Sequence, residues 1–449
     1  MDLGNGRLQL FQSGSLKRFV ALASMAVFIC YLLLGNLPRF GSVAETGNTF
    51  PVTEIALYLV VLGGGVVSRS LVINSLRFSL PVLALISLSF FYGAFVNGFL
   101  LKAFVFAVRL QLQLLVGVFL GAFAYWLYGR DYFRLLRALL SVYSVVLIFG
   151  FGIFFIFDDS MDLYGALATI GVRYVGDPHV GRLVSSYLDP NLFSTILLLP
   201  FIISVGFFIS RRSLLYFCLS IFFLLGVFYT VSRSGLGSLA ILLLFLFYRG
   251  CRYVFSRRMI SRRFLGFLVP SVVVVMFVLL GQGSDLIARI ADRFSEPVSQ
   301  EGSALLRLES FLIGFDVLQN HPIFGVGYNY GVVFAESRTL VSEHEGVQVG
   351  FDSSLLTMAV NFGLVATLGF LILLFRWFRR LWLALARLSE AQSLFLLIIS
   401  YLLVTILFSS FFNNILFYQF WLVPVVALCR YFALLARDLL GPDGLSERA

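Results

Sequence analysis

Twelve apolar runs, each close to the length that crosses a bilayer, constrain this chain more than any other feature. A helix needs about 20 predominantly apolar residues to span the hydrocarbon core. The runs are 19–37, 53–68, 78–95, 110–128, 138–157, 191–209, 213–230, 235–248, 264–281, 353–375, 393–411 and 414–434. A soluble domain could not cover so much apolar surface, because 60% of the 449 residues are hydrophobic and 12% are charged. We therefore predict an all-α, polytopic membrane protein with about twelve transmembrane helices.

The positions of lysine and arginine give the orientation of these helices. Cytoplasmic loops of membrane proteins carry an excess of both residues. If the N-terminus is cytoplasmic, the cytoplasmic loops and tails hold most of the 33 basic residues. We therefore predict that both termini are cytoplasmic and that the first run is a retained anchor, since no small-residue cleavage site follows it. The net charge of +10 follows from this topology and does not indicate a nucleic-acid partner.

Two long hydrophilic loops interrupt the apolar runs, and this topology places both on the outer side. The predicted segments are N-terminal transmembrane helices (1–157), a first outer loop (158–190), central transmembrane helices (191–281), a large outer catalytic loop (282–352), and C-terminal transmembrane helices with a cytoplasmic tail (353–449). Within the large loop, residues 303–320 space their apolar side chains as a helix does, and His321 and Pro322 end that run. The loop is therefore predicted to be partly helical.

Outer-side arginines are the candidates for binding a phosphate group, and they are Arg173, Arg182, Arg233 and Arg307. Arg233 lies in a short link between two apolar runs, beside serines and a glycine that allow an anion to approach; the alternative is an arginine that snorkels to lipid headgroups. Arg307 follows the predicted start of the outer helix, where an anion is favoured. Its alternative role is an ion pair with Glu301 or Glu309. Arg173 and Arg182 are alternative candidates for the same phosphate-binding role.

Candidates for the other chemical steps follow in the large loop. Asp352, His344 and Glu345 are the candidate bases, although Asp352 is also suited to cap the next helix. Tyr328, Asn329 and Tyr330 follow a glycine turn and could contact a sugar; their alternative role is loop packing. No metal site is predicted, since no Asp-x-Asp motif faces the outer side. The cysteines lie outside this loop and fit neither a metal site nor a disulfide framework.

The order of these motifs resembles the superfamily of bacterial O-antigen polymerases and O-antigen ligases. The matching pieces are Arg182 before Asp189, Pro190 and Asn191; the sequence TVSRSG at 230–235; Arg307 before Pro322, Gly325 and Gly327; and Asp352 with Ser353 before Gly363. The resemblance covers residues 170–370, and the first five apolar runs match by hydropathy alone. Each motif is short and unspecific by itself. The resemblance therefore rests on the order of the four motifs and on their predicted position on one side of the membrane.

This resemblance implies a GT-C-like, metal-independent glycosyltransferase that needs no cofactor. Its donor and acceptor would be undecaprenyl-pyrophosphate-linked glycans at the outer face of the bacterial inner membrane. Arginines would neutralise the diphosphate leaving group, and a carboxylate or imidazole would accept the proton of the acceptor hydroxyl. Its other expected partners are membrane lipids and a chain-length-regulating membrane protein.

One departure from the ligase pattern favours a polymerase. Ligases carry histidine where this chain has Asp352, and Gly, Thr or Val where it has Ala366. The function predicted is therefore polymerisation of lipid-linked repeat units into O-antigen or a related surface polysaccharide. The alternative is a ligase that transfers the glycan to lipid A core. A transporter or flippase is a third interpretation, but no matching pair of Gly/Pro-interrupted helices is visible in the sequence.

Overall fold

The chain is nearly all helical across the residues that the structure describes. The computed structural model describes residues 4–37, 39–40, 50–65, 69–157, 160–169, 179, 181–257, 288, 302–331, 351, 353–385 and 392–440. Within these residues the extended structure is one antiparallel pair, β1 (Arg39–Phe40) with β2 (Phe50–Pro51). The all-α character predicted from the apolar runs is confirmed for this part of the chain.

The helices follow the apolar runs along the chain. Those before the large outer loop are α1 (Gly4–Leu34), α2 (Val52–Gly65), α3 (Arg69–Asn97), α4 (Leu101–Tyr128), α5 (Tyr132–Ile156), α6 (Ser160–Thr169), the 3-10 turn η1 (Ser185–Tyr187), α7 (Pro190–Arg211), α8 (Leu214–Tyr229) and α9 (Arg233–Arg257). Those from the loop onward are α12 (Gly302–Asn320), α14 (Ser354–Leu385), α15 (Gln392–Val404), the π-helical turn η2 (Thr405–Ser409), α16 (Ser410–Phe412), the 3-10 turn η3 (Ile415–Phe417) and α17 (Gln419–Leu440). The helix predicted at 303–320 is α12.

Eight helices within the described residues are long and apolar enough to cross a membrane. They are Ser15–Leu34, Ser70–Asn97, Leu101–Tyr128, Tyr132–Ile156, Pro190–Arg211, Ser354–Leu383, Leu394–Phe412 and Gln419–Leu439. Three shorter apolar helices, Val52–Gly65, Leu214–Tyr229 and Arg233–Tyr248, accompany them. Each of these helices overlaps a predicted run, and the run at 264–281 lies outside the described residues. The chain is thus a multi-pass membrane protein, and twelve spans remain a prediction.

Helix α7 is central to one part of the bundle, where it packs against α8, α9 and α15. It begins at an N-cap, where the Asp189 carboxylate accepts from the backbone N–H groups of Asn191 and Leu192 at 2.7 and 3.1 Å. Most side chains along α7 are buried, as expected for a helix that is apolar all round. By contrast, α3 exposes Phe91 and Phe95, which indicates a lipid-facing helix.

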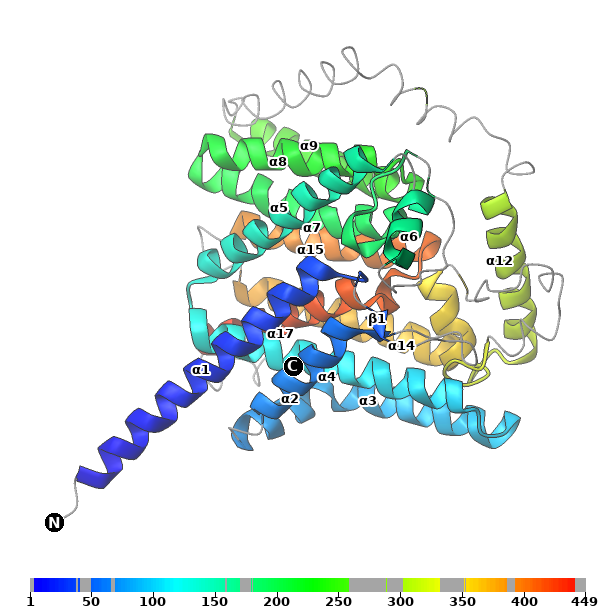
Figure 1. Ribbon diagram of the computed structural model, residues 1–449, viewed down its shortest axis with the longest axis horizontal. Coiled ribbons are helices and arrows are strands. Elements are labelled where there is room, and N and C mark those ends of the chain that lie inside the picture. The colour runs from blue at the N-terminus through cyan, green and yellow to red at the C-terminus, as the bar shows by residue number, and fades with distance from the viewer. Residues whose placement is uncertain are drawn as a thin grey trace.

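Helices α4 and α17 form another closely packed pair. Gly117 and Gly121 of α4 face α17, and a Cβ at Gly121 would collide with the carbonyl oxygen of Ala427. Small residues four apart let two membrane helices approach each other. Figure 1 shows α6 and α12, the helices of the two long loops, on the opposite side of the bundle from the N-terminal end of α1. This placement agrees with one common face for both loops.

Candidate functional site

Arg182 joins the first outer loop to two helix ends. Its Nε donates to the carbonyl oxygen of Thr230 at 3.0 Å, and its Nη2 donates to Oδ1 of Asn191 at 2.8 Å. The neighbouring backbone N–H of Leu183 donates to the carbonyl oxygen of Tyr229 at 3.0 Å. Two motifs that lie far apart in sequence are therefore brought into direct contact at the ends of α7 and α8.

The SRSG motif forms the start of α9, and three of its residues have visible structural roles there. Ser232 caps the helix: its carbonyl oxygen accepts from Leu236 N at 2.8 Å and its hydroxyl accepts from Gly235 N at 3.3 Å. A Cβ at Gly235 would collide with the hydroxyl of Ser194, so glycine allows α9 to approach α7. Arg233 is the first residue of α9 and is half-buried. It thus stands at the positive end of the helix dipole.

Asn413 connects the start of α9 to the start of α14, a role that the sequence analysis missed. Its Nδ2 donates to the hydroxyl of Ser234 at 2.6 Å. Its carbonyl oxygen accepts from the backbone N–H and the hydroxyl of Ser354, at 3.2 and 3.0 Å. The residue ends α16 after the π-helical turn η2, and such turns are frequent at functional sites. The Asn-Asn pair at the end of an apolar run was the available signal.

Ser353 caps α14, a role that sequence analysis considered for Asp352. Its hydroxyl accepts from Leu356 N at 3.2 Å and donates to the carbonyl oxygen of Ser410 at 3.2 Å. The prediction of a base at Asp352 lies outside the described residues, as do those for His344, Glu345 and Arg173. Arg307 lies in α12, but its side chain is also outside the described part of the chain.

These contacts define what we call the outer polar cluster. Its members are polar residues from the starts of α7, α9 and α14, from the C-terminal end of α8 and from two connecting segments, namely Arg182, Asn191, Thr230, Ser232, Arg233, Ser234, Ser353, Ser354 and Asn413. The hydroxyls of Ser232 and Ser234 lie 3.2 Å apart, and both side chains face this cluster. The cluster offers hydroxyl, amide and guanidinium donors, which are the groups that bind phosphate oxygens.

The glycine turn after α12 fills a break in a membrane helix. Helix α14 is interrupted at Gly363, whose φ of 80° lies in the region that favours glycine. Beside the break, Leu364 N donates to the carbonyl oxygen of Pro322 at 2.8 Å, and Val326 N donates to that of Val360 at 2.9 Å. Residues 321–331, the glycine loop, thus provide partners for backbone groups that the broken helix leaves unpaired.

The two tyrosines of the glycine loop are buried and pack it in place. The hydroxyl of Tyr330 donates to the carbonyl oxygen of Gly98 at 2.9 Å, which ties the loop to the α3–α4 turn. The ring of Tyr328 lies 6.3 Å from that of Phe417. Asn329 is half-buried and has a positive φ of 61°. Loop packing, the alternative considered for these tyrosines, describes their contacts here, and sugar binding stays a prediction.

A charged pair inside the apolar helices was not anticipated from the sequence. Arg109 of α4 donates through Nε and Nη2 to the two carboxylate oxygens of Glu54 in α2, at 2.9 and 2.6 Å. Glu54 also accepts from Gln113 at 3.0 Å and from the hydroxyl of Tyr58, and Arg109 Nη2 reaches Oε1 of Gln419 at 2.8 Å. The side chains of Arg109 and Glu54 are 19% and 1% exposed. For comparison, a charge at the centre of a membrane-spanning helix costs about 2.5–3.5 kcal/mol on insertion scales.

The Arg109 guanidinium also lies within electrostatic reach of the glycine loop. Burial raises the pKa of the Tyr328 hydroxyl above its ordinary range, and the positive charge of Arg109 acts in the opposite direction. The charged pair and the loop therefore belong to one region of the molecule.

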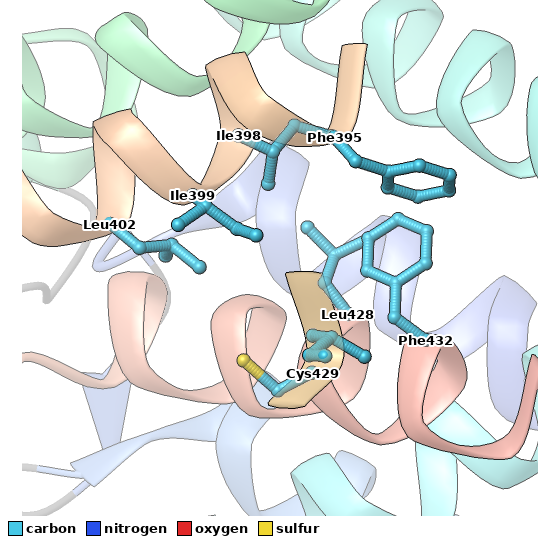
Figure 2. A pocket seen from close by; sticks show the side chains of 8 residues that line it. Phe395, Ile398, Ile399, Leu402, Leu428, Cys429 and Phe432 are labelled. Atoms are coloured by element: carbon cyan, nitrogen blue, oxygen red, sulfur yellow. The ribbon is translucent and has the colours of Figure 1, made fainter. Parts of the chain in front are cut away.

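The pocket drawn in Figure 2 is apolar, unlike the outer polar cluster and the charged pair. It lies between α15 and α17, and its lining residues are Leu381, Phe395, Ile398, Ile399, Leu402, Leu428, Cys429 and Phe432. All of these side chains are apolar, and they surround the space with hydrocarbon and one thiol. A diphosphate would be costly to transfer into such surroundings. The outer polar cluster is therefore the better candidate site.

Comparison with known protein families gives one match. Residues 218–371 match the model of a family described as O-antigen ligase. The chain contains an O-antigen ligase-family domain. This domain begins within α8 and ends within α14, so it includes the SRSG start of α9, helix α12, the glycine loop and the break at Gly363. The resemblance to the O-antigen polymerase and ligase superfamily is thereby confirmed. No curated protein matches the chain.

Proposed function

We propose that this protein is a membrane glycosyltransferase that polymerises undecaprenyl-pyrophosphate-linked repeat units into O-antigen or a related surface polysaccharide. The observation that carries the proposal is the outer polar cluster, in which Arg182, the start of α9 and Asn413 meet beside the start of α14. Most of its residues belong to motifs of the superfamily. The reaction would take place at the outer face of the inner membrane, with both termini in the cytoplasm.

The arginines would act on the leaving group. The acceptor hydroxyl oxygen attacks the anomeric carbon of the donor, and the bond from that carbon to the diphosphate oxygen breaks, with inversion. Negative charge then develops on the lipid pyrophosphate. Arg233 at the N-terminus of α9 would stabilise that charge together with the helix dipole. Arg182, oriented by Asn191 and Thr230, would supply a second guanidinium, and Arg307 or Arg173 a third.

The base would be a residue close to the start of α14. Asp352 directly precedes Ser353, whose hydroxyl already caps the helix. Because Ser353 carries the cap, the carboxylate of Asp352 is not needed for that role. It would accept the proton of the acceptor hydroxyl, with His344 and Glu345 as the alternatives. Asn329 of the glycine loop, with Tyr328 and Tyr330, would contact the sugar. The proposal includes neither a metal ion nor a cofactor.

A ligase is the second candidate, and the match to a family described as O-antigen ligase favours it. In that case the glycan would pass to lipid A core. Asp352, where ligases carry histidine, favours the polymerase instead. A polymerase would also be expected to work with a membrane protein that regulates chain length.

One assay separates the candidates. The purified protein is reconstituted in lipid and given a single lipid-linked repeat unit without another acceptor. A polymerase elongates this substrate, so the expected result is a ladder of products on a gel. A single product that appears only after lipid A core is added would replace the proposal with a ligase. Movement of the lipid-linked unit across the bilayer without bond formation would replace it with a flippase.

A further inference from the structure

A short segment of chain links the outer polar cluster to the charged pair. Residues 413–419 run from the break after α16, through η3, to the first residue of α17. At one end Asn413 holds Ser234 and Ser354. At the other end Gln419 accepts from Arg109 at 2.8 Å and lies 3.4 Å from Gln113. The segment is therefore held at both ends by side-chain hydrogen bonds.

The middle of this segment is fixed as well. The hydroxyl of Tyr418 donates to the carbonyl oxygen of Tyr187 at 3.2 Å and accepts from Asn36 at 3.1 Å. The backbone of Leu416 donates to the hydroxyl of Ser354 at 3.0 Å. Only five residues separate Asn413 from Gln419, so this hydrogen-bonded segment is a short path by which a shift of Gln419 would reach Asn413.

Packing of the helices does not by itself explain why a charged pair is present here. Replacing a buried ion pair with apolar side chains of similar volume is often neutral or stabilising, whereas removing one partner is strongly destabilising. Ionisable residues within membrane helices are, for this reason, functional candidates by default. Glu54 is fully engaged: it accepts from Arg109, Gln113 and Tyr58, so its carboxylate fixes the plane of the guanidinium.

We propose that Glu54 and Arg109 are positioning residues for the reaction, acting through Gln419 on Asn413 and so on the start of α9. This inference rests on the proposed function, because it assigns the pair to the same site. The pair touches the reacting groups at no point in this scheme. It sets the distance between the arginine-bearing start of α9 and the start of α14, where the leaving group and the base would act.

The test replaces the whole pair rather than one partner. In the double variant Glu54→Leu with Arg109→Met the charges are gone, so we expect thermal stability in detergent equal to or above that of the unchanged protein. A displaced catalytic segment lowers kcat by ~10²-fold, whereas KM for the lipid-linked substrate changes little. A pair that only ties helices together would give a stable double variant with unchanged kcat, and that result would overturn the inference.

A second variant tests the connection without disturbing the charges. Gln419→Leu leaves Glu54 and Arg109 paired, and we expect the same fall in kcat from a folded protein. An unchanged kcat would overturn the inference even if the double variant failed to fold. The matched control is the exposed Arg130–Asp438 pair, 2.6 Å apart, replaced by Met and Leu; its kcat should stay unchanged. Equal losses in the control and in the double variant would overturn the inference as well.

The unchanged protein in the same assay tests the proposed function separately. If it produces a ladder, the function stands whatever the variants do. If it transfers glycan only to lipid A core, the polymerase proposal fails, and the variants are then compared in that transfer reaction. A ~10²-fold lower kcat of Glu54→Leu/Arg109→Met in either reaction supports the positioning role, and an unchanged kcat in the reaction that does occur overturns it.

Discussion

Two arginines in this molecule are held in different ways. Arg182 is oriented by a carbonyl oxygen and an amide oxygen, at 3.0 and 2.8 Å. Arg109 is held by both oxygens of a carboxylate, at 2.9 and 2.6 Å. Hydrogen bonds to neutral oxygens orient a guanidinium without cancelling its charge, whereas a carboxylate does both. The carboxylate of Glu54 therefore ties Arg109 to the helix bundle, whereas Arg182 is proposed to meet an anionic substrate.

The largest expected effect concerns Asp352, the proposed base. Asp352→Asn should leave the fold intact, because Ser353 carries the cap of α14. Loss of a general base lowers a rate by ~10²–10⁴-fold. The elongation rate per folded protein measures it. Normal elongation by Asp352→Asn, together with failure of His344→Ala or Glu345→Gln, would place the base in the preceding turn.

The next prediction tests Arg233 and Arg182, the arginines proposed to bind the diphosphate. Arg233→Ala should lower elongation by ~10²–10³-fold, as removal of one donor to a developing negative charge does elsewhere. Arg233→Lys should also be impaired, since lysine lacks the planar fork. Arg182→Lys is expected to follow the same trend. Wild-type polymer from Arg233→Ala membranes at equal expression would contradict the assignment. The control is Arg130→Ala, in the exposed pair with Asp438.

The third prediction concerns stability, for which the contacts of Arg109 should matter more than those of Arg182. Glu54→Gln leaves the guanidinium of Arg109 buried without its carboxylate, which should cost about 3–5 kcal/mol of folding free energy. Arg182→Met removes two hydrogen bonds to neutral groups and should cost much less. Thermal unfolding in detergent compares the two. Equal stability losses would show that the two arginines are not held for different purposes.

The smallest effect concerns the cap itself. Ser353→Ala removes the acceptor for Leu356 N and should lower stability by about 1 kcal/mol, with activity retained in proportion to folded protein. The unfolding temperature and the elongation rate are measured together. A loss of activity without a loss of stability would mean that Ser353 takes part in the chemistry.

Sequence patterns predicted the helices well because long apolar runs have few alternatives in a membrane. The helix predicted at 303–320 appears as Gly302–Asn320. The motif order also led to the correct superfamily. These features depend on local spacing, which a single sequence contains.

Other features depend on contacts between distant residues and were not predictable. Glu54 and Arg109 lie in separate apolar runs, and neither run indicates that the two charges meet. In the sequence Asn413 is only a polar residue after an apolar run, and its hydrogen bond to Ser234 is visible only in the structure. The break at Gly363 needs the glycine loop as its partner, and helical periodicity says nothing about such a partner.

The filled break in α14 has a consequence for how this enzyme could diversify. The chain contacts α14 at Pro322 and Val326, and it rejoins the same helix at Ser354, nine residues before Gly363 and so about 14 Å away along the axis. The stretch of chain between these points therefore starts and ends on the same helix, α14. The entropic cost of closing a loop grows slowly with its length. Insertions and deletions in this stretch can therefore alter what the site accepts without changing how the helices pack.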